Sequence, residues 1–460
     1  MPARKRYEAP RLRQVAVGPM GKHRLVDVLP ASTVEGGWDA AELVARFGSP
    51  LFVVSEDRLR TLLEAFRKTF SGHGLSTRIA YSYKTNYLPA ICAVMAEEGA
   101  WAEVVSGMEY SLARALGVPA PEIVFNGPYK TREELERAIG EGALVNIDGF
   151  DELAAVEAVA RSVGRTARIG LRINFRADNQ LNWTKFGFSV EYGEAEEALA
   201  RVAGKRRLRL EALHNHCGTY NVDPGIYTRA VRALQQVARS ARRLGLAPTT
   251  VDLGGGFPSA NVLKPAFAAP GAARWSGEAL DDFADAILKP LARSRGPFGP
   301  SPTLILEPGR AVVDSAMQLV CTVVATKEIA GQGAAVVVDA GVNVVPTAYW
   351  YNHPVDAVEG AGGDIADGMR QVTVYGPLCM QIDVLRDQVL LPPMTIGTPL
   401  VIHNVGAYCL TQSMQFIQPR PAVVMIGPDG PVVIRRREEW RDIFALDSVP
   451  ERLRREGHAL

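Results

Sequence analysis

From about residue 78 to residue 310, the hydrophobic pattern of this chain alternates between two periods. Short apolar runs rich in β-branched residues recur, and between them apolar residues repeat every three or four positions. The first pattern is typical of buried strands and the second of amphipathic helices. Eight runs are predicted to be strands: 78–84, 102–106, 123–128, 144–149, 168–174, 210–216, 249–256 and 304–310.

Helices are predicted between these strands, for example over 151–164 and 224–245, and one more helix is predicted before the first strand. The apolar stripe of that first helix is formed by Leu59, Leu62, Leu63, Phe66 and Phe70. Strands and helices that alternate eight times predict a closed α/β barrel of parallel strands, wrapped in helices. An open doubly wound sheet has the same local pattern and is kept as the alternative.

The pattern changes after residue 310, where helical stripes become rare and Gly and Pro separate strand-like runs. These runs are 318–326, 334–339, 371–375, 398–404 and 422–426. They predict a second, mostly antiparallel β domain over 311–460, to which 25–29 and 51–54 would add strands. The barrel domain is expected over 50–310. Within it, residues 258–275 are rich in Pro, Ala and Gly and are predicted to form a loop insertion.

Composition narrows the class of protein. A net charge of +1 gives no global field that would attract nucleic acid or a membrane. No apolar stretch is long enough for a membrane span, and the N-terminus lacks an apolar signal core, so a cytoplasmic protein is expected. The five cysteines are scattered without a CxxC pair, which argues against a disulfide framework or a zinc site.

Unusual polar residues fall at the C-terminal ends of the predicted strands. They are Lys84, Ser106, Asn126, Asp148, Arg172, Asn174, His214, His216, Gly254, Gly255, Gly256, Glu307 and Arg310. In a parallel barrel these ends open on one face, and active sites lie on that face. Any one of them could merely cap a strand, but together they predict an active site.

Lys84 ends an apolar and aromatic run, Ala80-Tyr81-Ser82-Tyr83. An ammonium there is costly unless it is paired or partly neutral. A low-pKa amine at a rigid strand end suits an enzyme that forms a Schiff base with its cofactor. Taken alone, the residue fits better a lysine whose head reaches solvent, since exposed lysines are the rule.

The other strand ends allow more than one chemistry. Gly254, Gly255 and Gly256 could cradle a phosphate or form a tight turn, and Glu307 with Arg310 could bind a ligand or pair with each other. The two imidazoles of the His214-Asn215-His216 run could bind a metal, but no third ligand stands out nearby, so no metal site is expected. His216 is a candidate for stacking on a flat cofactor or for a buried, hydrogen-bonded role.

The ordered set of motifs resembles the fold-type III pyridoxal-phosphate (PLP) decarboxylases, the diaminopimelate and ornithine decarboxylase family of group IV. The resemblance covers about residues 50–425. It implies an alanine racemase-like (β/α)8 barrel followed by a β-sandwich or barrel-like domain. The matching segments are YSYKTN (81–86), VVSGMEY (104–110), LRIN (171–174), KFGF (185–188), HNHCGTY (214–220), DLGGGFP (252–258), EPGRAVV (307–313), GPLC (376–379) and VGAYCLTQSMQF (405–416).

The resemblance implies a role for each matching residue. Lys84 would hold PLP covalently, His216 would stack on its ring, and Glu307 would bind the ring nitrogen. Cys379 would enter the site of a neighbouring subunit and help to protonate the product, which implies a homodimer with shared active sites. The implied phosphate and cofactor contacts are Thr219, Gly254, Gly255, Gly256, Gly309, Arg310 and Tyr408.

Two positions depart from the diaminopimelate decarboxylase pattern. Val345 stands where an arginine precedes the proline of an Arg-Pro-x-x-Tyr segment, and Met380 stands where a glutamate follows the cysteine. Losing one partner of a buried charge pair costs about 3 kcal/mol or more. Arg310, Tyr349 and Met380 are then the expected substrate contacts.

Because of these departures, the leading hypothesis is an amino-acid decarboxylase that acts on a modified or non-standard substrate, of the kind used in siderophore or antibiotic pathways. Diaminopimelate decarboxylase of lysine biosynthesis is the alternative. The resemblance disfavours a racemase, since Glu307 occupies a position where racemases of this fold carry arginine. It also disfavours a non-catalytic PLP-binding protein, since such proteins lack Cys379 and the second domain.

Overall fold

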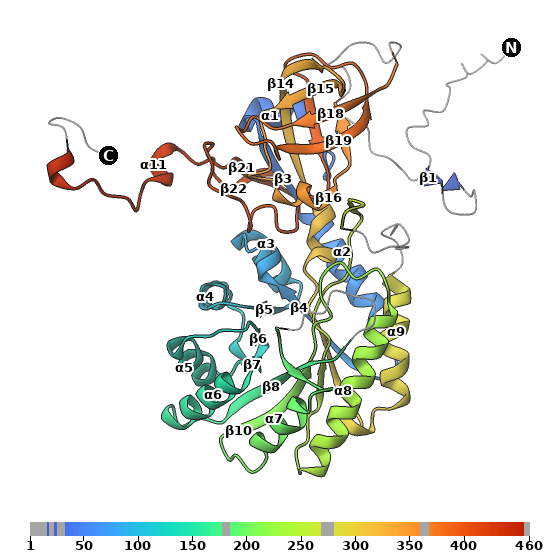
Figure 1. Cartoon of the computed structure of the whole chain (residues 1–460), viewed down its shortest axis with the longest axis vertical. Coiled ribbons are helices and arrows are strands. Elements are labelled where there is room, and N and C mark those ends of the chain that lie inside the picture. The colour runs from blue at the N-terminus through green and yellow to red at the C-terminus, as the bar shows by residue number, and fades with distance from the viewer. Residues whose placement is uncertain are drawn as a thin grey trace.

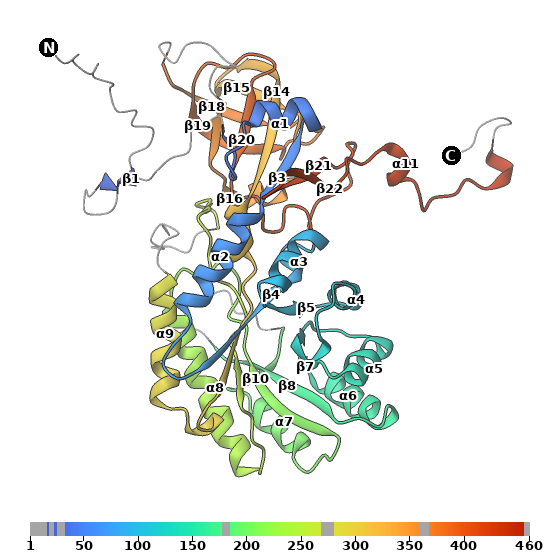
Figure 2. The same ribbon diagram turned by 180° about the vertical axis from the view of Figure 1, so that it is seen from behind.

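The computed structural model describes residues 16–17, 23–24, 33–176, 185–267, 280–358 and 368–454. Figures 1 and 2 show two parts stacked along the long axis: a barrel surrounded by helices, and a smaller body of strands at one end of it. Among the described residues, no helix is long and apolar enough to cross a membrane.

The barrel is a closed ring of parallel strands. Its members are β4 (Ser76–Ser82), β5 (Trp101–Val104), β6 (Ile123–Phe125), β7 (Leu144–Ile147), β8 (Ala167–Asn174), β10 (Leu208–His214), β11 (Thr250–Asp252) and β13 (Thr303–Leu306). The pairing of β10 with β8 closes the ring, so the open-sheet alternative is wrong. All eight predicted strands are confirmed, although several end before their polar residues. A short strand, β9 (Phe188–Ser189), pairs with β8 outside the ring.

The helices wrap the ring on its outside (Figure 1). They are α2 (Glu56–Thr69), α3 (Pro89–Glu97), α4 (Gly107–Ala115), α5 (Arg132–Glu141), α6 (Phe150–Ser162), α7 (Glu194–Val202), α8 (Gly225–Arg243) and α9 (Leu280–Arg293). Side chains at the helix starts explain several of these boundaries, because Ser55, Ser106 and Thr131 each accept a hydrogen bond from the amide three residues later.

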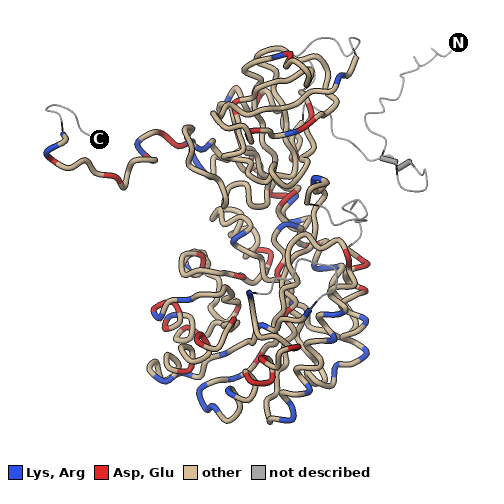
Figure 3. The backbone as a smooth tube through the Cα atoms, in the orientation of Figure 1, with Lys and Arg blue, Asp and Glu red and all other residues tan. Residues whose placement is uncertain are grey.

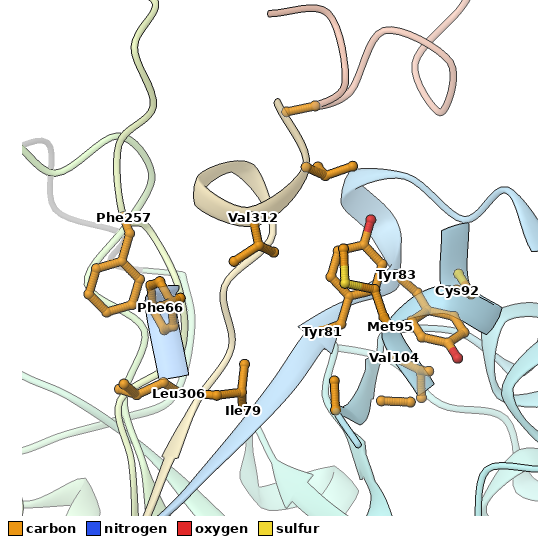
Figure 4. Packing of buried hydrophobic residues seen from close by; sticks show 14 of the residues in the cluster. Phe66, Ile79, Tyr81, Tyr83, Cys92, Met95, Val104, Phe257, Leu306 and Val312 are labelled. Atoms are coloured by element: carbon orange, nitrogen blue, oxygen red, sulfur yellow. The ribbon is translucent and has the colours of Figure 1, made fainter. Parts of the chain in front are cut away.

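Helix α2 packs where a helix after the eighth strand would otherwise lie. Only the short α10 (Arg310–Val313) follows β13, and α2 contacts α3, α9 and α10. The predicted stripe of α2 faces inward, with Leu62 partly buried and the other four side chains buried. Figure 4 shows Phe66 beside Phe257, with ring centroids 5.1 Å apart.

The second part is a mixed but mostly antiparallel sheet. Its order is β19-β18-β15-β14-β3-β21-β22, and β20 pairs with both β14 and β17. The bounds are β3 (Leu51–Ser55), β14 (Met317–Ile329), β15 (Gly333–Val338), β17 (Val355–Ala357), β18 (Arg370–Tyr375), β19 (Val384–Leu391), β20 (Pro399–Ile402), β21 (Ala422–Gly427) and β22 (Gly430–Arg435). The strand expected at 51–54 is confirmed as β3, between β14 and β21. The strand expected at 25–29 lies outside the described residues.

The insertion predicted at 258–275 is not wholly a loop. Its described part contains β12 (Val262–Leu263), which pairs antiparallel with β16 (Tyr351–Asn352). The amide of Lys264 also donates to the carbonyl of Trp350. The prediction is therefore corrected: this segment ties the barrel to the second domain.

Smaller elements lie at the two ends of the chain. Helix α1 (Ala40–Phe47) packs on the second sheet, and β1 (Ala16–Val17) pairs with β2 (His23–Arg24). After β22, a segment with the short helix α11 (Trp440–Ile443) extends away from the body in both views (Figures 1 and 2). Figure 3 shows acidic and basic residues interspersed over both parts, in keeping with a net charge of +1.

Candidate active site

The strand ends place the predicted residues around one mouth of the barrel. Lys84 lies in a short 3-10 turn directly after β4, and His216 follows β10 by two residues. Gly254–Gly256 follow β11, and Glu307 is the first residue after β13. Parallel pairing brings these ends to the same face, as the sequence predicts.

Lys84 is paired with a buried carboxylate that the sequence did not reveal. Its Nζ lies 2.6 Å from Oε2 of Glu103 on β5, and that carboxylate also accepts a hydrogen bond from the Ser82 hydroxyl. Burial alone would lower the pKa of Lys84, but the charges of Glu103, Tyr408 and Glu307 raise it above the ordinary value. Of the two possibilities for this residue, a paired ammonium and a partly neutral amine, the structure shows the paired ammonium.

A chain of hydrogen bonds crosses the barrel from Glu103 to Asp252. Asn126 Nδ2 donates to Glu103 Oε1 at 3.0 Å and to Glu307 Oε1 at 2.7 Å. Asn146 Nδ2 donates to Asn126 Oδ1 at 2.8 Å and to Asp252 Oδ2 at 3.1 Å. Asn126 was singled out as a strand-end residue, whereas Glu103 and Asn146 were missed. The signal for Glu103 was an acidic residue within the otherwise apolar run Ala102-Glu103-Val104-Val105.

Two carboxyl groups of this network, those of Glu307 and Asp252, resist ionisation. Burial, and then the charges of Asp252 and Glu103, raise the pKa of Glu307 well above its ordinary value. Burial likewise raises the pKa of Asp252 to about 7. A cationic group placed against Glu307 would restore its ionised form, and a protonated ring nitrogen is such a group.

His214 lies close to Glu307, and neither of its ring nitrogens has a hydrogen-bond partner among the described residues. Burial lowers its pKa well below the ordinary value, and its Nε2 is 3.8 Å from Glu307 Oε2. The fold brings His214, Asp252 and Glu307 close enough to hold a metal ion, so the expectation that no third ligand is near was wrong. Asn126, Asn146 and the Gly254 amide already engage the two carboxylates, and we assign no metal here.

His216 is oriented by the glycine run. The amide of Gly255 donates to His216 Nδ1 at 3.0 Å, and the amide of Gly254 donates to Asp252 Oδ1 at 3.0 Å. Burial, followed by the charges of Lys84 and Arg172, lowers the pKa of His216 well below its ordinary value. The imidazole is thus a neutral ring with its acceptor nitrogen facing the loop, which suits stacking on a flat ring.

Close packing requires glycine at these positions. A Cβ on Gly254, Gly255 or Gly256 would collide with His216, with the Glu307 carbonyl or with the Gly218 carbonyl. The Gly256 amide has no acceptor in the described part of the chain, whereas the other two amides are already used. A bound phosphate would therefore find one free donor in this loop rather than three.

Arg310 supplies a second hydrogen-bond donor that has no acceptor among the described residues. Its guanidinium lies 4.7 Å from the ring centroid of Tyr351, 5.2 Å from that of Tyr408 and 5.5 Å from that of Tyr220. Nη1 has no hydrogen-bond partner among the described residues and is 3.8 Å from Asp314 Oδ2. A buried guanidinium with a free N–H fits a phosphate or carboxylate.

The remaining predicted residues lie apart from this network. Thr219 and Cys379 are exposed, and Tyr349 is 53% exposed and packs against Phe267, with ring centroids 5.3 Å apart. Met380 is partly buried. The loop that carries Cys379 is fixed by a residue that the sequence did not reveal: Asp383 accepts hydrogen bonds from the amides of Val342 and Leu378.

Comparison with known proteins decides the family. A model of the pyridoxal-dependent decarboxylase, pyridoxal binding domain, matches residues 56–314. The chain belongs to the pyridoxal-dependent decarboxylases. Its cofactor is PLP and its reaction class is that of a carboxy-lyase, rather than a racemase or a cofactor carrier.

Individual relatives extend this family match over most of the chain. The diaminopimelate decarboxylase of Archaeoglobus fulgidus is 31% identical over 91% of this chain and 97% of its own. That of Methanocaldococcus jannaschii is 30% identical over 91% and 95%. The crystal structure of the latter enzyme with L-lysine has a TM-score of 0.81 at 29% identity and covers 92% of this chain and all of that one. These relatives favour the diaminopimelate alternative over a modified substrate.

The residues present fit this decarboxylase cofactor. Lys84 offers an amine at the barrel mouth, and the pKa of Glu307 stays raised although the charge of Lys84 opposes the rise. Arg310 Nη1 and the Gly256 amide are unfilled donors for a phosphate. Thr85 Oγ1 is a further buried polar atom without a partner among the described residues.

A buried acid beside the site gives this decarboxylase a pH-dependent stability. Burial raises the pKa of Glu109, in the first turn of α4, from 4.5 to about 7. A raised carboxyl pKa means that the stabilising contribution is complete below 4.5 and is lost as the pH rises through 7, by up to about 3 kcal/mol. Glu109→Gln should remove this loss. Urea unfolding at pH 5 and pH 8 checks it, because a difference between variant and wild type that stays constant would contradict the assignment.

Proposed function

We propose that this chain removes the α-carboxyl group of an amino acid at the barrel mouth, and that meso-diaminopimelate is the first substrate to test. The observation that carries the proposal is the placement of Lys84 and Glu307 on one hydrogen-bonded chain through Glu103 and Asn126. When bound, PLP supplies an electron sink for the carbanion left by loss of carbon dioxide.

Each residue has a defined task in this proposal. Lys84 would hold PLP covalently, and Glu103 would pair with the Lys84 ammonium when that amine is free. Glu307 keeps a proton on the ring nitrogen, and the neutral His216 ring stacks on the cofactor. Gly256 and the backbone at Gly309 bind phosphate; Thr219, Gly254, Gly255 and Tyr408 complete the cofactor site. Arg310 binds an anionic group.

Kinetics with meso-diaminopimelate tests the substrate. A kcat/KM of about 10⁴ M⁻¹s⁻¹ or more, with release of carbon dioxide and formation of lysine, would support the diaminopimelate assignment. No turnover of that compound, together with release of carbon dioxide from another amino acid, would refute it.

One observation favours a second candidate, a substrate with an uncharged distal end. Val345 is fully buried, and Met380 is a partly buried apolar side chain, so neither offers a charge partner. An amino acid whose distal amine and carboxylate are masked would lose no buried pairing here. Comparing diaminopimelate with its distally acylated or amidated forms separates the two candidates.

Domain boundaries and assembly also belong to this proposal. We infer a barrel domain over 50–310, apart from β3 (Leu51–Ser55), and a β domain over 311–460 that β3 joins. We also infer a homodimer in which Cys379 and Met380 act in the partner's site. Cys379 is exposed on a loop held by Asp383, as a residue contributed to another subunit would be.

Mixing two inactive variants tests the shared sites. Lys84→Ala and Cys379→Ala subunits should each have little activity alone. If each site takes Lys84 from one subunit and Cys379 from the other, random re-association restores about one quarter of the wild-type sites, because half of the dimers then contain one intact site. Recovery of turnover after mixing is the measurement, with each variant mixed with itself as the control. Mixtures that stay inactive would contradict shared sites.

A further inference from the structure

Asn126 occupies an unusual position in the floor of the site. It follows β6 directly, it is buried, and its own amide donates to the Val104 carbonyl at 2.8 Å. The two N–H groups of its side chain donate hydrogen bonds to two different glutamates, Glu103 and Glu307. Its carbonyl oxygen accepts from Asn146. Both donors and the acceptor of this one amide are therefore used.

We propose that Asn126 is a positioning residue that couples the two reactive ends of the cofactor site, the carboxylate that holds the Lys84 nitrogen and the carboxylate that faces the ring nitrogen. This inference rests on the roles proposed for Lys84 and Glu307. It assigns a task to a residue that touches neither nitrogen and acts only through Glu103 and Glu307.

The orientation of the amide is fixed by its neighbours. If the Asn126 amide flipped, its oxygen would face the two carboxylates and its NH₂ group would face the NH₂ of Asn146. Asn146 is held in turn by donation to Asp252 Oδ2 at 3.1 Å. Two donors aimed at two carboxylates favour the ionised form of both. A single neutral side chain thus links the charge at one end of the cofactor to the charge at the other.

The surrounding titratable groups come from six strands of the ring or from the residues that follow them. They are Lys84 after β4, Glu103 on β5, Arg172 on β8, His214 on β10, Asp252 on β11 and Glu307 after β13. In the described part of this shell, Asn126 and Asn146 are the uncharged side chains that connect the carboxylates. Removing Asn126 therefore breaks the connection while leaving every charge in place.

The pH dependence of the bound cofactor tests the coupling without a substrate. In Asn126→Ala the carboxylates lose a donor and hold nearby protons more tightly. The midpoint of the pH transition of the visible band should rise by about one pH unit, and PLP should dissociate faster on dialysis. With substrate, kcat should fall about tenfold or more, its acid limb should move to higher pH, and KM should change little.

Asn126→Asp sharpens the test because it keeps the shape of the side chain. The new carboxyl can donate one hydrogen bond when protonated, and when ionised it repels both glutamates. Activity should therefore decline further as the pH rises through the ionisation of that carboxyl. A purely structural role would give Asn126→Asp and Asn126→Ala the same pH profile.

Gln235→Ala is the matched control. Gln235, on the outer helix α8, is buried and donates from Nε2 to the carbonyls of Pro290 at 3.2 Å and Ser294 at 3.1 Å. This variant also loses two hydrogen bonds, so its Tm should fall, but its visible band and pH profile should match wild type. If Asn126→Ala behaves like this control in every readout, the coupling is refuted. A wild-type protein that shows no visible band with PLP would instead overturn the roles of Lys84 and Glu307, before any variant is made.

Discussion

Lys84→Ala is expected to abolish the visible absorption band of the PLP-loaded protein and to lower kcat by about a thousandfold or more. In our proposal, covalent attachment at position 84 would create that band, and no second lysine lies within the hydrogen-bonded chain from Glu103 to Glu307 in the described residues. An absorption spectrum from 300 to 500 nm, taken on protein dialysed with PLP, is the measurement.

Lys84→Arg separates the charge of the residue from its covalent chemistry. The guanidinium keeps a cation beside Glu103, so the fold and the buried pair should survive. It cannot form the covalent link, so the band and the activity should still be lost. A visible band that persists in both variants would place the cofactor on another residue.

The barrel could be predicted because its strands are buried on both faces. The strands within the runs 144–149 and 168–174, for example, are buried over almost their whole length, and all eight predicted runs became ring strands. Several strands were predicted to be too long at their C-terminal ends, because the polar residues there leave the strand pairing and line the site instead. The run 249–256, for example, ends as a strand at Asp252, because Gly254, Gly255 and Gly256 turn toward His216.

The hydrophobic pattern did not predict the two edge strands of the second domain, β19 and β22. β19 alternates poorly between buried and exposed positions, and β22 keeps Val432 and Val433 exposed. Both strands contain several apolar residues, but these residues do not alternate regularly with polar ones, so neither run shows the period-two pattern of a half-buried strand. Central strands such as β14 and β21 were predicted because they are buried.

In the site, the sequence identified residues but not their partners. Lys84 and Glu307 stood out because a charge at the end of an apolar strand needs a reason. Glu103 lies within a strand, and its pairing with Lys84 depends on the register of two neighbouring strands. The sign of the pKa change at Lys84 follows from that unseen partner, so the sequence alone could not decide between a paired ammonium and a partly neutral amine.

The floor of the site also explains why a cationic ligand would favour the ionised form of Glu307. Glu307 lies near Asp252 and Glu103, and its pKa is raised by burial first and by those charges next. Without a cation the chain holds an acid that resists ionisation. The same crowding that opposes the free carboxylate strengthens its attraction for a protonated ring nitrogen in a dry site.

Glu307→Gln should therefore separate catalysis from stability. The amide keeps the size of the side chain and an oxygen for Asn126, but it cannot balance the charge of the ring nitrogen, so kcat should fall about 10²- to 10³-fold with PLP still attached. The cofactor-free variant should be at least as stable as wild type at pH 8, because a buried acid that resists ionisation has been replaced by a neutral group. Steady-state kinetics and thermal unfolding give the two readouts.

Glu211→Gln is expected to show the opposite pattern, a loss of stability with unchanged turnover. Although burial opposes its ionisation, Glu211 pairs with Arg168 at 2.6 Å, and this partner holds the pKa of Glu211 below its usual range. Losing that pair should lower the Tm and leave kcat unchanged. If Glu307→Gln instead destabilised the protein while retaining turnover, Glu307 would be a structural acid, and the ring nitrogen would have to be bound by another group.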